Sequence, residues 1–186
     1  MAGTGPGDLD LVALDFLNAA ATVLDTIPTY DGLETLKGAP ERRYLSPGKP
    51  IPDCDQLTVH VGRIGEDATR PTGLGAGTRH KQEFRANIVT FVVTLYRCVP
   101  KIGSDLKAPR TDAQEAADAQ LNADAWALWN GLWNRLRSGE LRPRCSLVYM
   151  DSLAALPNSG GYGGWELTLR AQVEGYEQAV EEAAGS

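Results

Sequence analysis

The strongest constraint on how this chain can fold is one segment, Ala86–Pro100, with the sequence ANIVTFVVTLYRCVP. Its alternate positions form an unbroken apolar series: Val89, Phe91, Val93 and Leu95. The positions between them are semi-polar and rich in β-branched residues: Ile88, Thr90, Val92, Thr94 and Tyr96. A period of two predicts a β-strand, because successive side chains point to opposite sides of a sheet. This strand would be longer than the usual five or six residues.

The two faces of the predicted strand call for different surroundings. The apolar face must pack on helices. The second face is too apolar to suit water and too polar for a sealed core, so it suits contact with another subunit. Thr90, Thr94 and Tyr96 are therefore candidate interface residues. A central strand covered on both sides within one domain fits the same pattern, and the segment alone does not decide between these readings.

Two segments have helical periodicity. The first runs from Asp8 to about Asp25, with apolar residues at three-four spacing, a possible N-cap at Asp8 and a stop at Pro28. The second runs from Thr111 to about Ser138 and ends at Gly139. Its predicted apolar face consists of Leu121, Ala125, Leu128, Trp129, Leu132 and Leu136, flanked by Trp126 and Trp133. Core packing is the favoured interpretation of these tryptophans, and a docking surface for a partner is the alternative.

Further strands are predicted before and after the second helix. They are a short extended piece at Arg43–Leu45, then Leu57–Ile64, Cys145–Met150 and the alternating run from Trp165 to Glu174. The loop from Gly65 to Phe84 joins two strands and predicts a long β-hairpin. The whole order predicts a single α+β domain over residues 1–186, with flexible ends at 1–7 and 178–186. In it, an antiparallel or mixed sheet with a long hairpin packs against two main helices.

Charge and composition narrow the classes of function that the sequence supports. The net charge of −6 and the scattered basic residues disfavour nucleic-acid binding. No uninterrupted apolar run approaches the roughly 20 residues that span a bilayer. The N-terminal sequence lacks the features of a signal peptide, so we expect synthesis in a cytoplasm.

The sequence offers little for catalysis. Cys54, Cys98 and Cys145 are odd in number and widely spaced, so we expect them to be reduced, without metal and non-catalytic. A thiol–imidazole pair of Cys54 with His60 is conceivable, but no local signature supports it. The Cys and His residues lack the spacing of a metal site. We therefore predict no enzyme, no metal and no cofactor.

The long loop carries a local excess of basic residues in an acidic protein. Its candidate contact residues are Arg70, Arg79, His80 and Lys81. Its composition cannot bury much apolar surface, so we expect it to be mobile in a free subunit and to gain order on an acidic surface of a neighbour. A solvated hairpin tip without a partner is the alternative.

A resemblance rests on the segment from Ala39 to Val59. It contains Pro40-x-Arg42-x-Tyr44, then Gly48-x-Pro50, then Asp53-Cys54-x-Gln56-Leu57. In these motifs, and in the order of predicted elements over most of the chain, the protein resembles the tail terminator (head–tail joining) proteins of long-tailed phages that infect actinobacteria.

The resemblance implies a structural virion protein with an α+β fold. Its expected partners are itself, in a ring that is usually six-fold, the major tail tube protein, and the neck or head–tail stopper protein. DNA would pass through the ring without specific binding, and the protein would lie in the tail or neck after assembly in the host cytoplasm. The family has no catalytic residues to carry over. The alternatives are another neck or tail protein (adaptor, stopper or tail-tube subunit) and a cytoplasmic thiol enzyme that uses Cys54 and His60.

Overall fold

A mixed five-stranded sheet forms the centre of the protein, in strand order β1-β2-β3-β5-β4. The computed structural model describes residues 7–66, 87–101, 108–140, 145–159 and 161–173. β1 and β2 are parallel, and every other neighbouring pair is antiparallel. The strands are β1 (Arg42–Leu45), β2 (Gln56–Glu66), β3 (Asn87–Cys98), β4 (Cys145–Ser159) and β5 (Tyr162–Val173). The helices are α1 (Gly7–Asp25), the 3-10 helix η1 (Ile27–Thr29), α2 (Thr111–Trp126), the π-helical turn η2 (Ala127–Gly131) and α3 (Leu132–Ser138).

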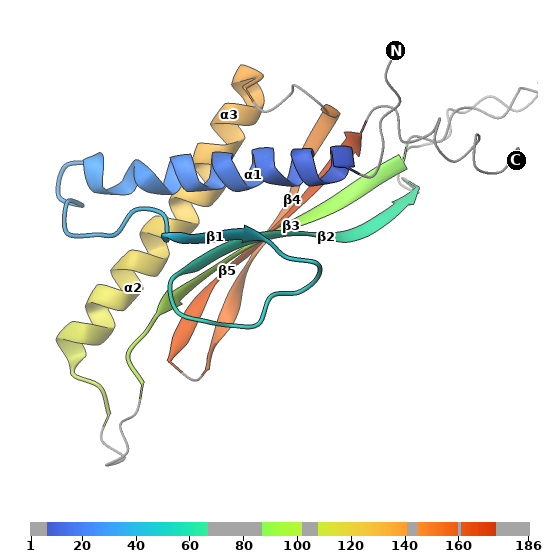
Figure 1. The fold of residues 1–186 in the computed structure, drawn as a ribbon. Helices are drawn as coiled ribbons and strands as arrows, with labels where there is room; N and C mark the ends of the chain where they lie inside the picture. The colour runs from blue at the N-terminus through green and yellow to red at the C-terminus, as the bar shows by residue number, and fades with distance from the viewer. Residues whose placement is uncertain (1–6, 67–86, 102–107, 141–144, 160, 174–186) are drawn as a thin grey trace, which may run out of the picture.

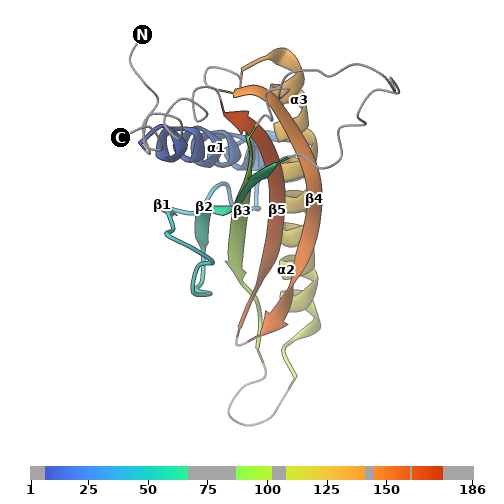
Figure 2. The same cartoon turned by 90° about the vertical axis from the view of Figure 1, so that its right-hand side faces the viewer.

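The helices cover one face of the sheet (Figures 1 and 2). α1 crosses the strands on that face, and α2, η2 and α3 together form one long helix beside it. The predicted α+β class, with two main helices on a mixed sheet, is confirmed. β2 and β3 pair with each other in antiparallel fashion. The loop predicted between them falls largely on residues 67–86, which lie outside the described residues.

Burial of β3 follows its sequence pattern. Val89, Phe91, Val93 and Leu95 are all fully buried, as predicted for the apolar face. The ring of Phe91 meets the ring of Phe16 on α1, with 5.1 Å between centroids. β3 is also the middle strand of the sheet, so its apolar face lies at the centre of the hydrophobic core.

The second long helix is not a regular α-helix throughout. Four of its buried side chains follow a spacing of four residues: Asp124, Leu128, Leu132 and Leu136, and Ala127 is buried beside them. On a regular α-helix that spacing drifts by about 40° per step. The π turn at Ala127–Gly131 adds a residue to one turn, which offsets the drift and keeps the buried side chains in line. Gly131 lies against Val23 of α1, where a Cβ atom would come within 2.8 Å of the Val23 side chain.

β4 is longer than the sequence indicated. The alternation predicts a strand only over Cys145–Met150, with a turn from Asn158, whereas the strand extends to Ser159. The register of β4 on β5 shifts between Met150 and Ser152 and again between Leu156 and Ser159. Each shift reverses the side-chain pattern, so the sequence shows no continuous period of two.

One helical stretch among the described residues, Leu9–Thr29, is long and apolar enough to cross a membrane by length and composition, with a mean hydropathy of 1.4. Polar residues such as Asp10, Asp15 and Asn18 interrupt this stretch, so it is not the uninterrupted apolar run whose absence the sequence analysis noted. More than half of the stretch is buried within the molecule, where α1 packs on β2 and β3.

Truncating a side chain on each face of β3 should show that the two faces contribute differently to the free energy of unfolding. Phe91→Ala should lower the free energy of unfolding by about 3–5 kcal/mol, because it leaves a cavity against Phe16. Thr90→Ala, on the half-buried second face, should cost much less and serves as the matched control. Urea denaturation of the isolated chain measures both. Equal losses would contradict the assignment of the two faces.

Candidate functional site

The second face of the sheet is partly covered by the connection that runs from β1 to β2 (Figure 1). Gln56 holds this connection in place. Its side-chain NH2 donates to the carbonyl of Ile51 at 2.7 Å, and its Oε1 accepts from the Tyr44 hydroxyl at 3.1 Å. Lys49, in the same connection, lies 3.8 Å from the Glu166 carboxylate on β5. The connection therefore acts as a small second layer.

This covering layer affects how far the candidate interface residues of β3 are exposed. Thr94 and Tyr96 are buried within the chain, and Thr90 is half-buried. Burial, with smaller contributions from Glu166 and Tyr162, raises the pKa of Tyr96. A contact of Thr90, Thr94 and Tyr96 with another subunit stays a prediction. Arg70, Arg79, His80 and Lys81 lie outside the described residues.

Buried polar atoms gather beneath the connection. Thr58 and Thr94 are cross-strand partners in the β2–β3 pairing, and their hydroxyl groups have no hydrogen-bond partner among the described residues. The same holds for Nδ1 of His60, two residues along β2. Burial lowers the pKa of His60, opposed by the Glu166 charge and reinforced by Lys49. The His60 imidazole and two hydroxyl groups thus line the inner side of this layer.

The motif residues that carry the family resemblance contact one another. Arg42 forms an ion pair with Asp53, and its guanidinium lies 5.6 Å from the centre of the Tyr44 ring. Tyr44 in turn donates to Gln56, and Leu57 is fully buried in the core. These residues therefore fold the segment back onto the sheet. The sequence motif describes one structural unit.

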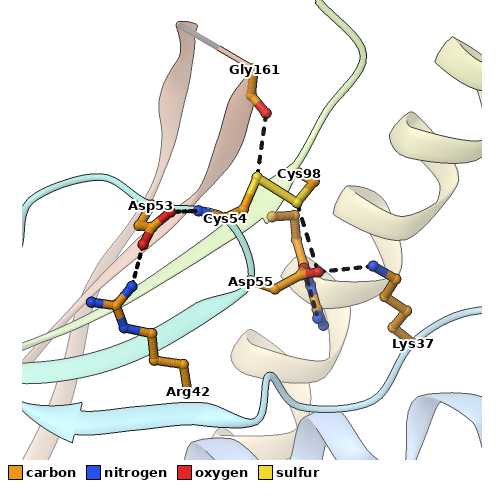
Figure 3. Close-up of a disulfide and its surroundings, with 8 residues drawn as sticks. Lys37, Arg42, Asp53, Cys54, Asp55, Cys98 and Gly161 are labelled. Carbon is orange, nitrogen blue, oxygen red and sulfur yellow. Dashed lines mark hydrogen bonds and ion pairs between the residues drawn. A yellow bond between two sulfur atoms is a disulfide. The ribbon is translucent and has the colours of Figure 1, made fainter.

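The expectation that all three cysteines are reduced is wrong for two of them. Cys54 and Cys98 form a disulfide, with their Cα atoms 4.8 Å apart (Figure 3). The cause is strand register. Gln56 pairs with Tyr96 and Leu57 with Leu95, so the same register places Cys54 opposite Cys98 at the end of the ladder. Aligning the two predicted strands in the sequence could have revealed the pairing, whereas the number and spacing of the cysteines gave no indication of it. Cys145 is buried.

Asp55 links the disulfide to the chain around it. Its backbone has a φ of 48°, a left-handed conformation that is uncommon for a residue other than glycine. Its carboxylate accepts a hydrogen bond from Lys37 at 2.9 Å and lies 3.8 Å from the sulfur of Cys98 (Figure 3). The Arg97 guanidinium is also 3.8 Å away.

A buried ion pair lies behind this corner of the sheet. Arg97 donates two hydrogen bonds to Asp124 on α2, at 2.8 and 2.9 Å, and a third to the carbonyl of Gly38. Gln120 donates to Asp124 and exchanges hydrogen bonds with the backbone of Lys37. The exposed fractions of the two charged side chains are 3% and 0%. Burial raises the pKa of Asp124, and its hydrogen bonds and charge interaction with Arg97 oppose that shift. The sequence analysis did not identify this pair.

The three tryptophans of the second long helix lie largely on its outside, so the favoured core interpretation is wrong. Trp126, Trp129 and Trp133 are 51%, 37% and 48% exposed. Trp126 packs edge-on against Tyr30, with 5.4 Å between ring centroids. The buried line of Asp124, Leu128, Leu132 and Leu136 occupies the side that faces the sheet, which leaves the tryptophans turned away from it.

The described residues offer limited material for chemistry. They contain no group of three or more His, Cys, Asp or Glu side chains that could hold a metal ion. Cys54 is bonded to Cys98, so in this state it has no thiolate to pair with His60. No protein-family model matches this chain, and no curated protein matches its sequence.

The disulfide should stabilise the monomer. It closes a loop with a sequence separation of 44, and breaking it should cost about 2–4 kcal/mol of unfolding free energy. Guanidinium denaturation of the wild type and of the double variant Cys54→Ser/Cys98→Ser gives the difference. Adding a reductant should bring the wild type to the stability of the variant. Identical midpoints with and without reductant would show that the bond is not formed in solution.

The buried ion pair should behave as one unit. Asp124→Leu leaves the Arg97 charge buried without its partner and should cost about 3–5 kcal/mol. The double variant Arg97→Met/Asp124→Leu removes both charges and should recover most of that loss. A double-mutant cycle by urea denaturation measures the coupling. Additive losses would contradict the pairing.

Proposed function

We propose that the protein is a structural virion protein, a phage tail terminator that forms a ring on the end of the tail tube and joins it to the neck. The observation that carries this proposal is the segment on which the family resemblance rests. Arg42 with Asp53, and Tyr44 with Gln56, make it one folded unit across the second face of the sheet. Motif residues that contact one another in this way have a structural reason to occur together.

The layering of the fold supports a role in assembly. Both main helices lie on one face, and among the described residues the other face is covered by the short connection between β1 and β2 (Figure 1). The sheet ends in two different edge strands, β1 and β4, on opposite sides of the subunit (Figure 2). Two unlike edges suit head-to-tail contacts, which close into a ring when the rotation between subunits permits. The exposed tryptophans add a further apolar surface for a partner.

The charge fits a protein that surrounds a DNA channel. With a net charge of −6, a ring of such subunits repels the phosphate backbone and lets DNA pass without sticking. A six-fold ring, contacts with the major tail tube protein and contacts with the stopper protein belong to the same proposal. They rest on the resemblance.

The second candidate is another structural protein of the neck or tail: an adaptor, a stopper or a tail-tube subunit. The same fold and charge support it. The candidates differ in where the chain sits in the particle and in how far it polymerises, since a tube subunit stacks into long polymers and a terminator stops at one ring.

Deletion of the gene and immunogold labelling test the proposal. Without this chain, we expect DNA-filled heads and separate tail tubes, because the tubes lack the cap that joins them. An antibody against the chain should label wild-type virions at one place, the head-proximal end of the tube. Label along the whole tube would show a tube subunit. Label on tailless heads would show a neck protein. Virions without label would contradict both candidates.

A further inference from the structure

The edge strand β4 and the helix α2 enclose a groove at one end of the subunit. It has a volume of about 430 Å³ and is lined by Asp118, Leu121 and Asn122 of α2, Ala155, Leu156 and Asn158 of β4, and Gly164 and Trp165 of β5. The indole NH of Trp165 donates to the carbonyl of Leu121 at 2.7 Å, which ties β5 to the helix. The groove therefore lies on the helix side of the sheet, between α2 and the β4–β5 pair, with the edge strand β4 at its outer side.

Among the described residues β4 pairs with β5 alone, so its other side is a free edge there, next to the groove. Between Ser152 and Leu156 its pairing with β5 is regular. Natural edge strands are usually guarded by charges, particularly lysine. The 15 residues of β4 include one charged residue, Asp151, which is already paired with Arg170 at 2.9 Å. Prolines and β-bulges also guard edge strands, but Pro157 and the register shifts of β4 lie outside Ser152–Leu156. This stretch can therefore accept another strand through its backbone.

The helix side of the groove is acidic. α2 carries Asp112, Glu115, Asp118 and Asp124 and no lysine or arginine. Asp124 is buried, Asp112 is paired with Arg110, and Glu115 and Asp118 are exposed one turn apart. An extended segment that carries positive charge would therefore be favoured beside α2.

The chain contains a segment with that charge. Residues 67–86, which join β2 to β3, include Arg70, Arg79, Lys81 and Arg85 against Asp67 and Glu83. The segment is thus net positive in a protein of net charge −6. With 20 residues between the two strands, it is long enough to supply one added strand.

The position of the groove favours a neighbouring subunit as the source of that strand. Residues 67–86 connect Glu66 to Asn87, which pair with each other, whereas Gly164 of the groove pairs with Tyr96 near the other end of β3. These two ends are about 30 Å apart along the strand. A segment that goes out and back spans at most about 35 Å. A segment of this reach meets its own groove only when fully stretched, which favours the groove of a neighbour.

We propose that the α2–β4 groove receives residues 67–86 of a second copy of this chain, as a strand added to the edge of β4. The contact is head-to-tail, because Glu66 and Asn87, which flank the segment, lie at the opposite end of the sheet from the groove. Repeated around a symmetry axis, it links subunits into a ring. This inference rests on the proposed function and names the surface through which the ring would form.

A synthetic peptide of residues 67–86 serves as the probe, with the full-length chain as the receptor. Between Ser152 and Leu156, hydrogen exchange should slow at the β4 amides that point away from β5 when the peptide binds. Ala155→Arg places a long cation in the groove and should weaken binding about tenfold or more. Ala154→Arg is the matched control: it adds the same charge to the same strand on the opposite face, since Ala155 pairs with Trp165 and Ala154 with Glu166. It should bind within about twofold of the wild type.

Charge reversal tests the acidic side. Asp118→Lys should weaken binding of the natural peptide. A peptide with Arg79→Glu and Lys81→Glu should restore binding to the Asp118→Lys variant. Hydrogen exchange at the β3 amides checks that each variant is folded. Three results would each overturn the proposal: absence of binding, equal binding to Ala155→Arg and Ala154→Arg, or protection in the dilute monomer of the β4 amides that point away from β5. The test is independent of tail assembly, so rings on tail tubes that tolerate Ala155→Arg would refute the groove and leave the proposed function standing.

Discussion

The Arg97–Asp124 ion pair joins three parts of the chain at one buried point. Arg97 comes from the end of the central strand, Asp124 from the long helix, and the carbonyl of Gly38 from the connection before β1. A buried charge without its partner is strongly destabilising, so none of these parts can shift alone. The pair therefore sets where the helix crosses the sheet, and with it the line of Leu128, Leu132 and Leu136 that packs against the core.

The two faces of the sheet are closed in different ways. Apolar side chains and helices close one face, and the energy there comes from burial of surface such as that of Phe91. A proline-rich connection closes part of the other face and is held by polar contacts around Gln56 and by the disulfide. This division explains why the second face is neither a sealed core nor a bare surface. It also leaves the rest of that face and the edges of the sheet for other contacts.

Sequence patterns predicted the elements in which each face keeps the same environment along its whole length. α1 and β3 are such elements, and their bounds and buried faces agree with the prediction. Patterns failed where distant residues decide the outcome. The Cys54–Cys98 bond depends on the register between two strands. Exposure of the tryptophans depends on which side of a helix with a π turn the sheet occupies. The groove beside Ala155 requires the edge position of β4, which no local pattern reveals.

The exposed disulfide makes the subunit sensitive to the compartment that surrounds it. A bacterial cytoplasm keeps thiols reduced, whereas the medium outside a cell lets disulfides form and persist. A virion subunit made in the first and used in the second would fold with separate thiols and gain the bond after the cell has lysed. The Cys54–Cys98 bond would then contribute nothing to folding or assembly. Its stabilisation would apply to the finished particle, at the stage when damaged subunits can no longer be replaced.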